Sequence, residues 1–352
     1  MHVTARLAAG NPGLLRSPGF DSFFIIGIPL IAIASGFLVA YKNELFLPVL
    51  TADLWLLGYH HVVSTYTRLG FDTQSFREHR SLILYLFPIV ALTVILLAVY
   101  IGAWLVTTVY LYWQWWHYTR QSEGISKAYA AKSRDKDTGN AIIRRASFYA
   151  VPSLAVLVMS SRSPDTFLFF DVRTLPVSGV ILAVAAAMTA VFVVLWLLDQ
   201  YRAYRAGKLA TSYVAYVLSH FAVYFIAYVQ ISDINYGWLT INIWHNLQYI
   251  LFVWLYNNRR FNGRANTEQK FLSTLSQNNR FPMYFMACLT ISTVTYWLID
   301  RYLAATVSSA LAMSATMGVL IIYQTINFHH YIVDSVIWKL RKPKIQRTLG
   351  LS

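Results

Sequence analysis

Residues 82–100 read LILYLFPIVALTVILLAVY, an apolar run without a single charged side chain. An α-helix rises about 1.5 Å per residue, so about 20 such residues cross a hydrocarbon core of about 30 Å. A helix also satisfies its own backbone hydrogen bonds inside lipid, where no water is present to do so. Comparable runs recur along the chain. Together they predict an all-α, polytopic integral membrane helix bundle.

The composition of the whole chain supports the same class of protein. Hydrophobic residues make up 57% and charged residues 12%, whereas a soluble domain has about 25% charged residues. We predict a cytoplasmic N-terminus at 1–21, a single transmembrane helical domain at 22–338 and a basic cytoplasmic tail at 339–352. We expect about 10 transmembrane helices, or eight if some segments are re-entrant. The ten segments are 22–41, 46–67, 82–100, 103–120, 147–161, 176–198, 209–230, 240–257, 283–300 and 307–331.

Basic residues predict how these spans are oriented. In the ten-span arrangement, all but four of the 29 Lys and Arg residues lie on one side of the membrane. The exceptions are Lys42, Arg162, Arg173 and Arg301. Because cytoplasmic loops carry the excess of Lys and Arg, we place both termini in the cytoplasm of a multi-pass protein, and we expect the bacterial inner membrane. The net charge of +14 then comes from basic cytoplasmic loops beside the lipid bilayer. We therefore expect no nucleic-acid partner.

Histidines are the most unusual feature of the predicted spans. A histidine in hydrocarbon is rare unless it faces the bundle interior and has a partner there. Any single one can simply bond to a neighbouring helix, but here they gather between the midplane and the cytoplasmic face, in a slab of roughly 15 Å. We therefore predict that they converge on one buried metal centre. The seven candidates are His60, His61, His117, His220, His245, His329 and His330.

The geometry of a helix limits how many of these histidines bind one ion. Neighbouring residues point about 100° apart, so at most one of His60 and His61 is expected to be a primary ligand. The same holds for His329 and His330. Neutral imidazole suits iron, copper, zinc and nickel. A site of about four imidazoles follows, and the other histidines are left to orient a ligand, bind substrate or pack.

Acids and aromatic residues near the histidines are candidates for supporting roles. Asp334 lies four residues after His330 and shares its helix face, and Glu123 follows His117 closely. Carboxylates of this kind orient metal-bound imidazoles by accepting their second N–H. Asp53, the other acid at membrane depth, is expected to cap its helix. Trp113 and Trp116 flank His117 and line either a substrate path or the interfacial aromatic belt.

Four short segments, taken in order, resemble the Brp/Blh-type β-carotene 15,15'-dioxygenases, a family of polytopic membrane iron enzymes. The segments are Gly58-Tyr59-His60-His61, Trp116-His117-Tyr118, Trp244-His245-Asn246-Leu247-Gln248-Tyr249 and His329-His330-Tyr331-Ile332-Val333-Asp334, the last followed by a basic tail. The resemblance implies a metal site made from His60 or His61, His117, His245, and His329 or His330. It implies supporting roles for Tyr249 and Asp334, with Trp244 beside the substrate. Tyr249 stands where the family has a second histidine.

The resulting prediction is a membrane-embedded non-haem iron oxygenase, an oxidoreductase acting on an apolar, lipid-like small molecule. By resemblance, cleavage of a carotenoid or isoprenoid is the first choice, with O2 as cosubstrate and one or two Fe ions. An alternative is a di-metal hydroxylase or desaturase, in which the surplus histidines and Glu123 hold a second ion and an electron donor is a partner. Further alternatives are a b-haem electron-transfer protein, a transporter with a histidine relay and a metal-free lipid transferase.

Overall fold

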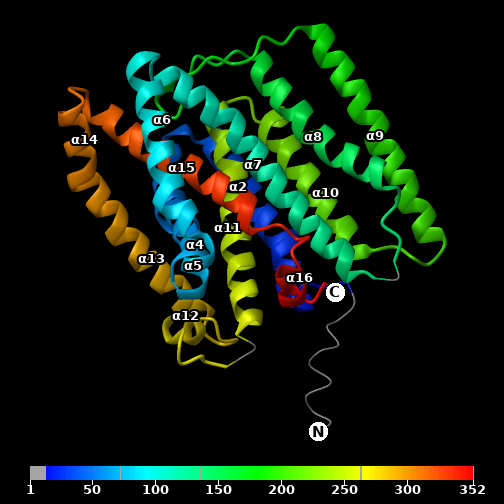
Figure 1. Cartoon of the computed structure of the whole chain (residues 1–352). Coiled ribbons are helices and arrows are strands. Elements are labelled where there is room, and N and C mark those ends of the chain that lie inside the picture. The colour runs from blue at the N-terminus through cyan, green and yellow to red at the C-terminus, as the bar shows by residue number, and fades with distance from the viewer. Residues whose placement is uncertain (1–12, 72, 135, 262–263, 352) are drawn as a thin grey trace.

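The computed structural model describes residues 13–71, 73–134, 136–261 and 264–351. Most of the predicted N-terminal region 1–21 therefore lies outside the described residues. The described chain is almost entirely helical, as predicted (Figure 1). Its only strands within these ranges are β1 (Thr166–Phe167) and β2 (Phe170–Asp171), which form one short antiparallel pair.

Six helices of the described part of the chain are long and apolar enough to cross a membrane. Three contain α-helices joined by a turn of π-helix, so they run on without a break: α1 (Pro18–Ser22) with α2 (Ile28–Tyr41), α5 (Thr73–Ser81) with α6 (Phe87–Tyr100), and α13 (Phe281–Leu298) with α14 (Ala304–Ala310). The six helices are Pro18–Tyr41, which contains α1 (Pro18–Ser22) and α2 (Ile28–Tyr41), Thr73–Tyr100, α8 (Ala141–Ser161), α9 (Gly179–Arg205), Thr211–Gln230, which contains α10 (Thr211–Phe225), and Phe281–Ala310.

Four further long helices are less apolar. They are the continuous pair α3 (Phe46–Asp53) and α4 (Tyr59–Leu69), joined by the π-helical turn Leu54–Gly58, α7 (Ala103–Lys132), α11 (Ile234–Arg260) and α15 (Ala315–Ile337). Two short helices complete the fold, α12 (Lys270–Leu275) and α16 (Pro343–Leu349). Most of the ten predicted segments thus fall within a helix. The segments 176–198 and 209–230 begin three and two residues before their helices, and 307–331 is interrupted where α14 ends and α15 begins.

The two groups of helices differ in where they lie. Helix α11 runs through the middle of the bundle, and 22 of its 27 residues are buried. Helix α9, at the edge in Figure 1, also has 27 residues, of which four are buried. An apolar helix that exposes most of its surface needs lipid around it, whereas α11 hides its polar side chains among other helices.

Glycines bring the helix backbones close to α11. A Cβ added to Gly36 on α2 would lie 1.9 Å from Oγ1 of Thr240, and one on Gly237 would lie 2.0 Å from the carbonyl oxygen of Ala227. Small residues of this kind allow membrane helices to pack at short distance. At its start, α11 is capped by Asp233, whose Oδ1 accepts hydrogen bonds from the backbone N–H of Asn235 and Tyr236.

The two ends of the described chain meet at one end of the bundle. The backbone N–H of Gly13 donates to the carbonyl of Lys132 at 2.9 Å, and the Lys132 ammonium donates to the carbonyl of Gly350 at 2.7 Å. Arg259, in the last turn of α11, donates to the carbonyls of Leu15 and Leu349. The tail predicted as a basic surface segment therefore also folds back over α11, with α16 packed against it.

Candidate metal centre

Four of the seven predicted histidines converge in the bundle interior. They are His61 on α4, His117 on α7, His245 on α11 and His330 on α15, one from each of the four less apolar helices. Each offers one ring nitrogen such that all four nitrogens lie within 4.8 Å of one another, and all four residues are buried. We call these residues the histidine cluster.

The rings of the cluster pack directly against one another. Nε2 of His61 lies 2.8 Å from Nε2 of His330. The centroid of the His117 ring is 5.1 Å from that of His245 and 5.0 Å from that of His330. The rings of α4, α7, α11 and α15 therefore contact one another directly.

The donor atoms fit a metal ion. Nε2 of His117 and both ring nitrogens of His245 are buried and have no hydrogen-bond partner within the described residues, which costs free energy unless something binds them. A tetrahedral metal–imidazole site has metal–nitrogen distances of about 2.1 Å and hence about 3.4 Å between nitrogens. The separations of up to 4.8 Å need a contraction of little more than an ångström.

A second layer of side chains holds His330. Its Nδ1 lies 2.9 Å from Oγ1 of Thr65, and its Nε2 lies 3.6 Å from Oδ2 of Asp334. When Nδ1–H donates to Thr65, Nε2 keeps a lone pair directed at the cluster. Tyr249 connects these partners, because its hydroxyl lies 2.7 Å from Oγ1 of Thr65 and donates to Oδ1 of Asp334 at 2.8 Å.

Two tyrosines cover the faces of the other rings. Tyr118 stacks on His245 with centroids 3.9 Å apart, and Tyr331 stacks on His117 at 4.3 Å. The Tyr118 hydroxyl donates to Oδ1 of Asn242 at 2.5 Å, and Asn242 donates to Oδ2 of Asp53 at 2.6 Å. The prediction that Asp53 caps its helix is therefore wrong, because the helix continues past this residue. The buried Asp53 carboxylate instead accepts the last hydrogen bond of this chain.

The other three predicted histidines lie outside the cluster. His60 packs edge-on against Phe285. Nε2 of His329 lies 2.7 Å from the carbonyl oxygen of Leu82. His220 stacks on Phe148 at 3.9 Å, and its Nδ1 lies 3.0 Å from Oγ of Ser122. His329 and His220 have hydrogen-bond partners that hold helices together, which is the simple structural role open to any single buried histidine.

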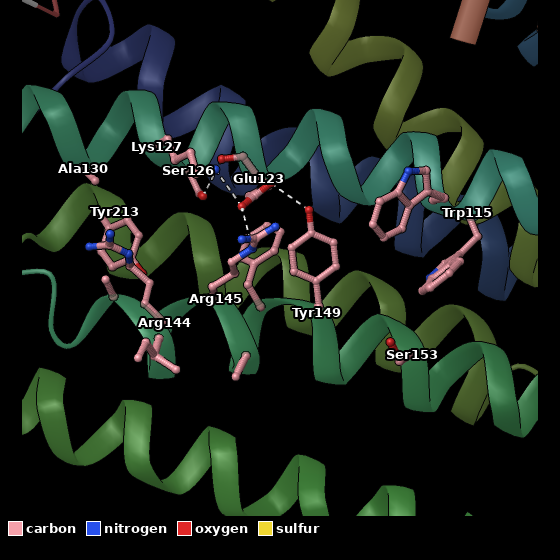
Figure 2. A pocket seen from close by; sticks show the side chains of 15 residues that line it. Trp115, Glu123, Ser126, Lys127, Ala130, Arg144, Arg145, Tyr149, Ser153 and Tyr213 are labelled. Carbon is pink, nitrogen blue, oxygen red and sulfur yellow. Dashed lines mark hydrogen bonds and ion pairs between the residues drawn. The ribbon is translucent and has the colours of Figure 1, made fainter. Parts of the chain in front are cut away.

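Glu123 also lies apart from the cluster, in an ion-pair group between α7 and α8. Its carboxylate lies 2.7 Å from the Lys127 ammonium and accepts a hydrogen bond from the Tyr149 hydroxyl at 2.7 Å. Figure 2 shows these residues with Arg145, whose Nε lies 3.8 Å from Oε1 of Glu123. They line a cavity of about 850 Å³, and no histidine of the cluster is among its lining residues. This cavity is therefore separate from the candidate metal site.

A cavity of about 710 Å³ does reach the cluster, and we call it the entry cavity. His117, Tyr249 and Asp334 contribute to its lining, as do the predicted substrate residues Trp113 and Trp116. Trp244 does not; it is buried beside His220, with centroids 5.8 Å apart. Two of the three predicted tryptophans therefore lie where a molecule approaching the cluster would pass.

Several residues of the site were not predicted from the sequence. Thr65 lies one helical turn after His61, and Asn242 lies three residues before His245, so each shares a face with a cluster histidine. Trp338, whose Nε1 donates to the Tyr249 hydroxyl at 3.0 Å, follows Asp334 by four residues. Helical spacing from the histidines was the signal that could have found all three.

Comparison with known proteins gives no match for this chain, whether with family models, with curated proteins or with solved structures. The resemblance to the carotene dioxygenases therefore rests on the four quoted segments alone. In the structure, one histidine from each of those segments belongs to the cluster.

Replacing Asp334 with asparagine is expected to lower the affinity of the cluster for a metal ion by about 10- to 100-fold, the usual effect of disturbing the outer hydrogen bonds of a ligand. Asp334 ends the hydrogen-bonded chain that runs from Nδ1 of His330 through Thr65 and Tyr249. The amide keeps the shape of the side chain but removes the negative charge near His330. Metal affinity is measured by competition with a chelator. Ser335→Ala is the control, since Ser335 lines the same cavity and bonds only within its own helix. Equal affinity in both variants contradicts the supporting role of Asp334.

Proposed function

We propose that this protein is a membrane-embedded non-haem iron oxygenase, with His61, His117, His245 and His330 as the ligands of one iron ion. The observation that carries the proposal is the burial of four imidazoles with all their ligand nitrogens within 4.8 Å of one another. Neutral imidazoles are suitable ligands for ferrous iron. Iron accepts more than four ligands, so four imidazoles would leave positions on the ion for other molecules.

The supporting chemistry comes from the residues around the cluster. A ferrous ion held by these four histidines would supply the activation of O2 for attack on a carbon–carbon double bond. The chain holds the ligands through Thr65 and Asp334, and the Tyr118 and Tyr331 rings shield two of them from water. Such a dry and fixed environment is the usual contribution of a protein to cofactor chemistry.

The proposal includes ten membrane spans with both termini in the cytoplasm of a bacterial inner membrane. The helices α7, α11 and α15 have 30, 27 and 23 residues, and about 20 residues suffice to cross. Their polar side chains face one another around the cluster, which explains why their composition is less apolar than that of the outer helices. The meeting of both chain ends at one end of the bundle supports an even number of spans.

One ion is favoured over two. Among the described residues, only one group of His, Cys, Asp and Glu side chains has the spacing of metal ligands. Glu123 is engaged with Lys127 and Arg145. Cleavage of a double bond by O2 forms two carbonyl groups and needs no outside electrons, whereas a hydroxylase or desaturase requires an electron donor. The single site therefore favours cleavage of an unsaturated isoprenoid, such as a carotenoid.

The test is the metal content and optical spectrum of the detergent-purified protein from iron-supplemented cells. We expect close to one iron per chain and no Soret band. Protein without iron, or with stoichiometric haem, overturns the proposal. Turnover is then tested by incubation with β-carotene and O2 in mixed micelles. Aldehyde products are expected, and their absence with an iron-loaded protein rejects this substrate while leaving the metal site standing.

A further inference from the structure

The entry cavity joins two very different environments. At its inner end lie His117, Tyr249 and Asp334 of the metal centre. At its outer end it is lined by basic side chains from three parts of the chain, namely Arg120, Lys127, Arg145, Lys339 and Arg341. A plain hydrocarbon offers these charges no partner, whereas an anionic group does.

The acid at this mouth does not neutralise its basic residues. Glu123 pairs with Arg120 at 2.5 Å, with Lys127 at 2.7 Å and with Arg145 at 3.8 Å. One carboxylate thus faces three cations. The Lys339 ammonium and the Arg341 guanidinium have no ion-pair or hydrogen-bond partner within the described part of the chain. Positive charge is left over on both sides of the opening, on the α7–α8 side and on the segment after α15.

Between the two ends the lining is largely apolar. Trp113, Phe252, Tyr331 and Leu340 contribute to it, and Trp113 stacks on Phe328 with centroids 5.1 Å apart, which fixes its ring as a wall. An apolar chain lying along this wall would reach His117 with one part while its end stayed at the basic mouth. Burial of such a chain is favourable by about 0.8 kcal/mol for each CH₂ group.

We infer that the entry cavity binds a lipid whose apolar chain ends in an anionic headgroup, a carboxylate or a phosphate, with the headgroup held by Arg145, Lys339 and Arg341 and the chain directed at the histidine cluster. This inference rests on the proposed function for the role of the cluster. It narrows the substrate class from any apolar isoprenoid to one with an acidic end. Guanidinium and ammonium groups are the usual partners of carboxylates and phosphates.

Lysines and arginines at a cytoplasmic membrane surface also attract anionic lipids in general. The distinguishing feature here is that the basic residues line the same cavity as His117 and Asp334. The basic residues of α16 offer a comparison. Lys344 pairs with Glu78 at 2.9 Å, and neither Lys344 nor Arg347 lines the entry cavity. Removing the charges of Lys344 and Arg347 changes the net charge of the protein as much as removing those of Lys339 and Arg341, but leaves the mouth of the entry cavity intact.

The experiment measures binding of 11-(dansylamino)undecanoic acid and of its methyl ester to the full chain in nanodiscs of zwitterionic lipid. We expect the acid to bind about tenfold more tightly than the ester, since each partly exposed ion pair contributes a factor of up to about five. In the double variant Lys339→Gln/Arg341→Gln the two ligands should bind within about threefold of each other. In Lys344→Gln/Arg347→Gln the tenfold preference should persist.

Three results overturn the inference. The first is equal binding of acid and ester to the unmodified protein. The second is an equal loss of preference in the two double variants, which would assign the effect to general surface charge. The third is that millimolar inorganic phosphate displaces the fluorescent acid as effectively as unlabelled dodecanoic acid does. That result would indicate a site for a free anion. The same titration with His61→Ala tests this inference separately from the proposed metal site. If the metal-free variant still prefers the acid to the ester, the lipid site is supported even if the proposed function is wrong.

Discussion

His61→Ala is expected to abolish stoichiometric metal binding, whereas His60→Ala is expected to leave it intact. The two residues are adjacent on α4, but His61 contacts His330 and His245 while His60 packs against Phe285. Loss of an outer partner of a ligand already lowers affinity by about 10- to 100-fold, and loss of one ligand of four should exceed that range. Metal content after gel filtration in detergent measures the difference.

The adjacent pair on α15 provides an independent repeat. His330→Ala should lose the ion, and His329→Ala should keep it, because the His329 ring is bonded to the carbonyl of Leu82. A cavity left by a buried histidine destabilises the protein in all four variants, so the His60 and His329 variants control for damage to the fold. Retention of full metal by His61→Ala and His330→Ala, or equal loss in all four variants, contradicts the proposed ligand set.

Gly237→Ala is expected to destabilise the whole bundle by about 1–3 kcal/mol or more, the cost of forcing an extra methyl group into a packed site. The new Cβ would lie 2.0 Å from the carbonyl oxygen of Ala227. That atom belongs to the backbone, so no flexible side chain can turn away, and α11 must shift relative to the π-helical turn Ile226–Gln230 that follows α10. The shift carries His245 with it, and we expect lower metal content together with a lower melting temperature in detergent.

Gly124→Ala is the matched control for this prediction. Gly124 is also inside a long helix, α7, but a Cβ there meets nothing within 4 Å. Alanine favours a helix over glycine by up to about 1 kcal/mol, so this variant should melt at the same temperature as the unmodified protein or slightly higher. If the two glycine variants melt alike, close backbone approach is not what positions α11.

The helical framework could be predicted from the sequence in detail. The apolar runs lie in long helices of the structure, apart from 307–331, which includes the break between α14 and α15. Hydropathy is a local property of a chain, and in lipid it leaves few alternatives to a helix. The acid Asp53 was misjudged because its partner Asn242 is distant in sequence, and no local pattern connects them.

The membership of the metal centre could be predicted only in part. Helix geometry predicted at most one ligand from each adjacent pair, and the structure has His61 and His330 in the cluster. Which member of each pair faces inward depends on how α4 and α15 are rotated. Trp244 was grouped with the site because it directly precedes His245, but one residue along a helix is about 100° around it. Glu123 lines the entry cavity with His117 but does not belong to the cluster.

The sequence by itself determined an all-helical chain with apolar helices long enough to cross a membrane, because hydropathy and helical length both follow from the local order of residues. Only the tertiary structure decided that His61, His117, His245 and His330 meet, and that a cavity with a basic mouth leads to them. The rotation of each helix about its axis is fixed by contacts with other helices, such as the close approach at Gly36 and Gly237, and that rotation selects which side chains share the interior.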